Sequence, residues 1–210
     1  MAISTTGVSP GGAVKASTMV AVIGQVNAIA LVGQTPASSA SGVTVTPGGS
    51  VTFTNAAAVT LSGAFSGSYD NYRIVWDIPS QTAAADLQMR LTNAGTDDTS
   101  ANYSYMRGYD NYNALNRTVS GATAASLWLL TAGASASQTN DGYLDLWGPA
   151  LTRYTSGLAQ AVVHNPSPQM YTTTTNLFMG TSTAYDGFTI FPVSGTITGT
   201  LRVYGYNNLT

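Results

Sequence analysis

The 210-residue sequence predicts an all-β protein, namely an antiparallel, jelly-roll-like β-sandwich preceded by an N-terminal arm. Apolar and polar residues alternate over many short stretches, which is the pattern of strands with one buried face. Turn-forming residues separate these stretches, and no gap between them holds a helix long enough for a crossover between parallel strands. Helix surfaces are usually rich in Glu and Lys, whereas this chain has no Glu and a single lysine, Lys15.

The arm is expected to cover residues 1–42, which contain no aromatic residue and only one charge, Lys15. A short helix is compatible with four apolar residues at roughly helical spacing, Met19, Ile23, Val26 and Ala30. A secretory signal peptide is the alternative, but this apolar stretch begins late and contains Gly24, Gln25 and Asn27. The same interruptions make it too short to span a bilayer. We therefore expect an attachment arm without membrane insertion.

The sandwich domain is expected to cover residues 43–210. Its clearest alternation lies in three stretches, 71–78, 86–91 and 201–206. Shorter runs of the same character predict further strands at 43–46, 51–55, 59–62, 103–107, 126–130, 143–147, 158–163 and 188–191. Turn residues predict chain reversals at 47–49, 93–95, 140–142 and 186–187.

The composition excludes several classes of function. Without Cys, the chain cannot form a disulfide, a reactive thiolate or a Cys/His zinc site. A net charge of −2 argues against nucleic acid and against a polybasic membrane surface, since both need clustered cations. Charged residues make up 8% of the chain, against roughly a quarter in ordinary soluble proteins. So little charge is easier to understand if copies of the chain cover much of its surface, which predicts a homo-oligomer.

No recognisable catalytic motif is present, so we expect neither an enzyme nor a cofactor. His164 could act as a general base, but it has no motif partner and is better explained as a loop residue at a strand end. Asp97, Asp98 and Asp141 could bind Ca²⁺, yet the alternating acidic loop is missing and turn formation explains them more simply. A pair of Asp residues could still hydrolyse a glycosidic bond, because the sequence does not give the distance between carboxyl groups.

Aromatic residues give the strongest indication of a binding surface. If Leu144 and Leu146 face the core, then Tyr143, Asp145 and Trp147 share the outer face of their strand. Flat amphipathic rings beside short polar groups suit the faces of sugars or protein partners. The alternative is that these rings fill a second buried face. The candidate contact residues are Tyr109, Asp110, Tyr112, Tyr143, Asp145 and Trp147.

Three segments of the chain resemble bacteriophage virion proteins of the minor tail or fibre type. They are Phe65-x3-Tyr69-Asp70-Asn71-Tyr72-Arg73-Ile74-Val75, Leu87-x-Met89-Arg90-Leu91 with the loop Gly95-Thr96-Asp97, and the strand Ile197–Tyr206. The resemblance covers about 51–206. It implies a virion protein with a jelly-roll-like domain, commonly trimeric, that attaches through its N-terminal region and turns its C-terminal domain toward the host. The chain departs from that pattern because it has no fibrous shaft and no coiled coil.

The expected function is that of a homotrimeric phage tail fibre or tip protein, assembled into the virion in the host cytoplasm. Its expected partners are copies of itself, other virion proteins through residues 1–42, and host-surface glycan. One alternative is a capsid decoration or head-fibre protein that stabilises the head. The other is a small glycan-degrading enzyme that uses paired Asp residues.

Overall fold

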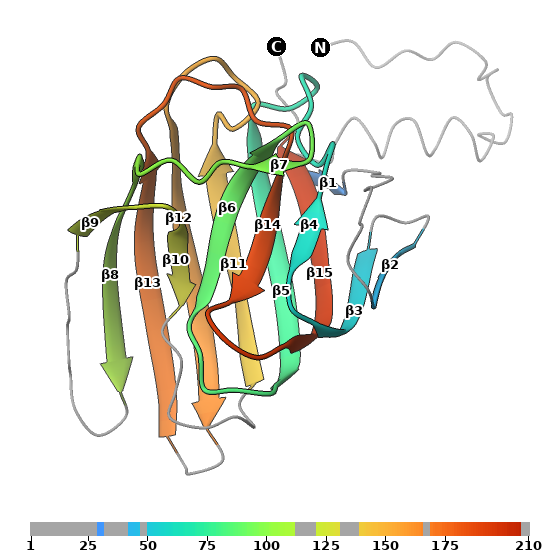
Figure 1. The fold of residues 1–210 in the computed structure, drawn as a ribbon, viewed down its shortest axis with the longest axis vertical. Helices are drawn as coiled ribbons and strands as arrows, with labels where there is room; N and C mark the ends of the chain where they lie inside the picture. Colours follow the sequence, from blue (N-terminus) through green and yellow to red (C-terminus); the bar gives the residue numbers. More distant parts are fainter. Residues whose placement is uncertain are drawn as a thin grey trace, which may run out of the picture.

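A computed structural model describes residues 29–31, 42–46, 50–111, 121–130, 139–165 and 169–206. In these ranges the chain forms strands, turns and bends, and contains no helix. The strands belong to two antiparallel sheets that face each other (Figure 1). The predicted all-β sandwich is therefore confirmed.

The larger sheet has ten strands. In spatial order they are β2 (Val43–Val45), β3 (Ser50–Ala56), β15 (Ile197–Tyr206), β5 (Asn71–Gln81), β11 (Thr139–Trp147), β12 (Thr155–Asn165), β13 (Gln169–Met179), β8 (Tyr103–Asn111) and β9 (Gly121–Ala124), with β1 (Ile29–Leu31) also paired to β15. The smaller sheet has five strands. They are β10 (Leu127–Leu130), β6 (Leu87–Asn93), β14 (Gly187–Pro192) and β4 (Val59–Leu61), with β7 (Thr96–Asp97) paired to β6.

The strand order is that of a jelly roll with an extended edge. Four strands of the larger sheet lie in the order β3-β15-β5-β11, and four strands of the smaller sheet lie in the order β4-β14-β6-β10. These are the two four-stranded halves of a jelly roll. The strands β12, β13, β8 and β9 continue the larger sheet beyond β11. The larger sheet is therefore wider than its partner and has a broad outer face.

The core lies between the two sheets and follows the predicted alternation. The inward side chains of β5 are at most 2% exposed: Tyr72, Ile74, Trp76 and Ile78. Opposite them, the smaller sheet contributes Leu87, Met89, Leu91 and Phe188, none of which is measurably exposed. Burying each such side chain contributes about 1.5–3 kcal/mol, so this layer supplies much of the stability of the fold.

The turn predicted at 140–142 is wrong, because β11 runs straight through these residues (Figure 1). The Nδ2 of Asn140 donates a hydrogen bond to Oε1 of Gln81 at 2.8 Å, inside the sandwich. The Trp76 ring lies against Gly142, where a Cβ would come within 2.5 Å of Trp76 Cζ2. Core packing therefore requires these polar and small residues in a strand, and this overrides their preference for turns.

The other predicted turns have different outcomes. At 93–95 the chain does reverse between β6 and β7, with φ of 50° at Ala94 and 76° at Gly95, as in a tight hairpin. At 186–187 a loop ends where β14 begins. The turn predicted at 47–49 lies outside the described residues.

Most of the predicted arm also lies outside the described residues, including nearly all of the predicted short helix. Its last residue, Ala30, lies in β1 and pairs with Gly205 of β15, so this part of the segment joins the larger sheet. In the ranges that the structure describes, no helix is long and apolar enough to cross a membrane.

The contact between Trp76 and Gly142 leads to a stability prediction. Gly142→Ala places a methyl group 2.5 Å from Trp76 Cζ2 and 2.6 Å from the Gln160 carbonyl oxygen. Relieving this overlap must shift the ring or the backbone, so we expect the free energy of unfolding to fall by about 1–3 kcal/mol. Urea unfolding of the two proteins measures the difference.

Gly108→Ala is the matched control on the same sheet. A Cβ at Gly108 meets no atom within 4 Å, so this substitution should leave the unfolding midpoint unchanged or raise it slightly. Equal midpoints for wild type and Gly142→Ala would contradict the close packing of the Trp76 ring against Gly142.

Candidate functional site

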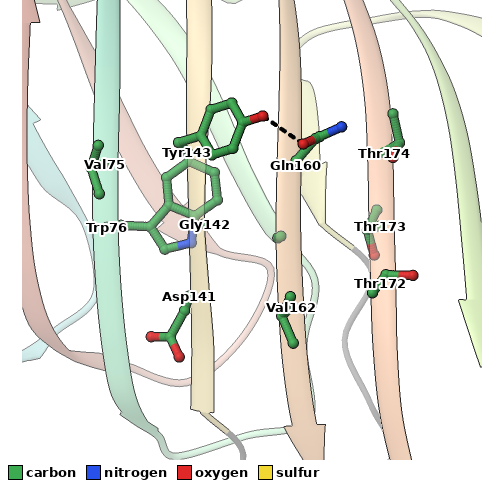
Figure 2. Close-up of a pocket in the computed structure, with 11 residues that line it drawn as sticks. Val75, Trp76, Asp141, Gly142, Tyr143, Gln160, Val162, Thr172, Thr173 and Thr174 are labelled. Carbon is green, nitrogen blue, oxygen red and sulfur yellow. Dashed lines mark hydrogen bonds between the residues drawn. The ribbon is translucent and has the colours of Figure 1, made fainter.

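The outer face of the larger sheet carries two adjoining depressions. The central depression, about 560 Å³, is lined by residues of β5, β11, β12 and β13 (Figure 2): Val75, Trp76, Asp141, Gly142, Tyr143, Gln160, Ala161, Val162, Thr172, Thr173 and Thr174. The second, about 290 Å³, is lined by Met106, Arg107, Gly108, Asp110, Thr172, Thr174 and Asn176. Because both include Thr172 and Thr174, they adjoin at β13, and we call the two together the outer trough.

Sheet register brings the side chains of the trough into line. Tyr143 on β11 pairs with Gln160 on β12, Gln160 pairs with Thr174 on β13, and Thr174 pairs with Gly108 on β8. Directly paired residues point to the same face of a sheet. Four strands that are distant in sequence therefore supply one row of polar groups, and the glycine leaves that row open at its β8 end.

The polar groups of the central depression are mostly uncharged. The Tyr143 hydroxyl donates a hydrogen bond to Oε1 of Gln160, and the amide nitrogen of Gln160 points toward β13 (Figure 2). Thr172 and Thr174 on β13 are exposed and add hydroxyl groups. Val162 on β12 lies between Asp141 of β11 and Thr172 of β13, is half-buried, and adds an apolar patch. The surface therefore offers hydrogen-bond donors, acceptors and apolar contact side by side.

A pair of carboxyl groups lies at one edge of the trough. Asp141 on β11 is directly opposite Asp77 on β5. Burial raises the pKa of Asp141, and the nearby charge of Asp77 and a hydrogen bond with it raise the pKa further, while His164 opposes the shift. Both residues are exposed on the outer face, where a bound molecule can reach their carboxyl groups.

Asp145, four residues along β11, has a structural role. Its carboxylate accepts two hydrogen bonds from Arg73, at 2.7 and 2.6 Å, and one from the Tyr206 hydroxyl at 2.6 Å. Burial alone would raise the pKa of Asp145, but these hydrogen bonds and the Arg73 charge outweigh burial and lower it. Burial and Asp145 together raise the pKa of Tyr206 to about 12. The cluster joins β5, β11 and β15 and leaves Asp145 little capacity to bind a ligand.

The structure separates the predicted contact residues. Tyr143 lines the central depression, and Asp110 lines the second depression on β8. Trp147 is 41% exposed on the same face as Tyr143, beyond the trough, and alternates with buried Leu144 and Leu146. Asp145 is bound as described. Two residues cannot be placed in the site: Tyr109 lies on β8 but its side chain is outside the described part, and Tyr112 lies outside the described residues.

Sequence reasoning missed most of the trough because it missed β13. The segment 169–179 holds four consecutive threonines, whose branched side chains favour strands, but it lacks the apolar alternation on which the strand prediction relied. A threonine run between two apolar stretches is the signal that could have found it. Gln160 and Gly108 carry no local signal, because only the register places them beside Tyr143.

The other ionisable candidates have structural surroundings. His164 is exposed near the end of β12, as the strand-end interpretation predicts. Asp98 accepts hydrogen bonds from the Ser100 backbone N–H at 2.9 Å and the Tyr185 hydroxyl at 2.7 Å, and so forms a turn. Asp97 accepts one from Thr189 at 2.6 Å. Among the described residues, no group of three or more His, Cys, Asp or Glu side chains could hold a metal ion.

Two carboxylates on β11 should affect stability in opposite directions. Asp145→Asn leaves the Arg73 guanidinium without its carboxylate, so we expect the free energy of unfolding to fall by about 1–3 kcal/mol at pH 7. Asp141→Asn removes a like-charge pair and should raise it by about 0.2–1 kcal/mol. Urea unfolding of both variants beside wild type measures these changes.

The pH dependence provides the control. The folded-state pKa of Asp141 lies above the ordinary 3.8, so the folded state binds the extra proton and the penalty of ionising Asp141 appears as pH rises above 3.8. The advantage of Asp141→Asn should therefore grow with pH in that range and vanish below it. For Asp145 the folded-state pKa is lower than 3.8, so the deficit of Asp145→Asn should shrink as pH falls below 3.8. Equal pH profiles for the two variants would contradict these assignments.

No known family model matches the chain, and no curated protein matches it either. Its function must therefore be inferred from its own residues and their geometry.

Proposed function

We propose that the chain is a structural protein of a bacteriophage virion, a homotrimeric tail fibre or tip protein whose outer face contacts host-surface glycan. The observation that carries this proposal is the meeting of two of its phage-like segments. The Phe65–Val75 segment leads into β5, which pairs along its length with the C-terminal segment in β15. A Cβ on Gly205 of β15 would lie 2.4 Å from the ring of Tyr69, so the two segments fit closely.

The aromatic residues of the first segment form part of the core. The Tyr72 hydroxyl accepts a hydrogen bond from the Ser66 N–H and donates one to the Ser66 carbonyl, both at 2.7 Å. The rings of Phe65 and Tyr72 lie 4.8 Å apart. This packing gives the segment a structural reason for its sequence, which supports the view that the phage-like residues specify a fold rather than a catalytic site.

Exposed apolar side chains on the outer face support self-association. Phe178 on β13 is 41% exposed, and the 59% exposed ring of Tyr154 packs edge-on against it, with the ring centroids 5.4 Å apart. A protein with so few charges gains solubility when such groups are covered by copies of itself. Host contact would then use the polar outer trough beside this apolar group.

The oligomer prediction is a trimer whose formation depends on these apolar residues. The full chain should sediment as a trimer, and Phe178→Ser with Tyr154→Ser should shift it toward the monomer because the change removes apolar area from the contact. Val193→Ser is the matched control, since Val193 is 55% exposed but lies past the end of β14 in the smaller sheet. Sedimentation of wild type as a monomer would reject the trimer.

Attachment to the particle is tested by removing residues 1–28, which keeps β1 and its pairing with β15. We expect the shortened protein to unfold at the wild-type temperature but to be missing from purified particles, because the arm is proposed to dock on other virion proteins. Immunogold labelling of particles that carry the full chain shows whether it lies on the tail or on the head. Absence of the full chain from particles would reject the virion role, and label spread over the head would favour a decoration protein.

A further inference from the structure

We infer that the outer trough binds a neutral oligosaccharide lying across the strands, with the row Tyr143, Gln160 and Thr174 as its main polar contact. This inference rests on the proposed contact with host glycan and identifies both the place and the class of glycan. The shape of the trough, its hydrogen-bonding groups and its charge each favour such a ligand.

The shape of the trough suits a chain of sugars more than a single small molecule. It runs from Val75 on β5 to Gly108 on β8, across four inter-strand spacings. At ~4.8 Å for each spacing, its length is about 19 Å. Its central part, about 560 Å³, lies within the range of volumes found for ligand sites. Gly108 keeps the far end open, because no atom lies within 4 Å of the place of its missing side chain.

The hydrogen-bonding groups match sugar hydroxyls, which both donate and accept. The Tyr143 hydroxyl holds Oε1 of Gln160, so the amide orientation is set and its NH₂ group is left to donate toward β13. The hydroxyls of Thr172 and Thr174 can donate or accept. Val162 lies in the same depression and offers apolar contact to the C–H face of a sugar ring. A β-sheet fixes all these groups before binding, which lowers the entropic cost of association.

The charge of the trough selects against acidic glycans. None of the residues that line its central depression is Lys, Arg or His. Asp141 lies in that depression with Asp77 opposite it, and Asp110 lines the other end of the trough. Two cations adjoin the trough, and both are in ion pairs. Arg73, whose Cζ lies 4.6 Å from the centroid of the Tyr143 ring, pairs with Asp145 at 2.6 Å, and Arg107 in the lining of the second depression pairs with Asp86 at 3.4 Å. A polyanion would therefore meet carboxylates and cations that already hold a carboxylate, whereas a neutral chain can donate hydroxyl hydrogens to the carboxylates.

The test uses the full chain on an array of neutral hexose, deoxyhexose and N-acetylhexosamine oligosaccharides, with heparin and polygalacturonate fragments as acidic probes. We expect at least one neutral probe to bind and the acidic probes to bind at least tenfold more weakly. Calorimetric titration of the best neutral probe then gives its dissociation constant. No binding by any neutral probe, or tighter binding by the acidic ones, overturns the inference.

Two glycine variants then locate the site. Gly108→Trp fills the open end of the trough and should weaken the neutral probe more than tenfold. Gly67→Trp is the matched control, because that position is equally open but lies in the loop before β5, outside the trough. Equal affinity in both variants overturns the placement. A change of oligomeric state in Gly108→Trp alone would show instead that the trough is a contact between copies and also overturns it.

A second variant tests the chemistry without changing the shape. Thr172→Val with Thr174→Val removes two exposed hydroxyls and keeps the branched side chains, so folding should be unaffected and affinity should fall about tenfold. Unchanged affinity would exclude the threonine row as the contact. The inference and the proposed function fail separately, because a chain that binds the neutral probe but is missing from particles keeps the trough and loses the virion role.

Discussion

The close contact between the Trp76 ring and Gly142 determines the geometry of the larger sheet. A methyl group at position 142 would overlap the indole, so β5 and β11 can pair in this register only with glycine at that point. The indole N–H has no hydrogen-bond partner among the described residues, so packing alone sets the position of the ring. Since the side-chain period of a strand is two, this one register decides that Asp141 and Tyr143 face outward. The trough therefore depends on this contact, whose two residues also line its central depression.

The greater width of the larger sheet explains why its outer face is broad enough to hold a trough that crosses five strands. In the jelly-roll half, β3-β15-β5-β11 is covered on one side by the smaller sheet, and β12, β13 and β8 extend the sheet beyond β11. Their outward residues need not be apolar, and on β13 they include Thr172, Thr174 and Asn176, all exposed. Inward residues of the same strand, such as Thr175 and Met179, are buried. One strand thus stabilises the sandwich and supplies polar groups to the trough, because its two faces meet different surroundings.

The parts of the fold that sequence could predict are those in which local pattern and tertiary packing agree. In β5 the alternation of Tyr72, Ile74 and Trp76 with polar residues matches one buried face, and the structure buries all three. Residues 140–142 show the opposite case, since a turn-forming sequence lies in a strand because of contacts with residues about sixty positions away. The trough belongs to this second kind. Tyr143 was identifiable as an outward ring, but its neighbours Gln160 and Thr174 are brought to it by pairing alone.

Three of the few cationic side chains of the protein form ion pairs within the chain. Arg73, Arg90 and Arg107 each form an ion pair, with Asp145, Asp97 and Asp86, and each pair lies partly out of solvent. These three pairs tie strands or loops together and cancel in charge. Asp77 and Asp141 differ, because they face each other, and burial together with that proximity raises the pKa of Asp141. Like charges held side by side cost stability, and the fold would be more stable without one of them.

A destabilising pair at the edge of a polar depression is most simply explained by a requirement of the surface rather than of the fold. In the proposed function that requirement is an acceptor-rich edge that neutral sugar hydroxyls can satisfy and acidic groups cannot.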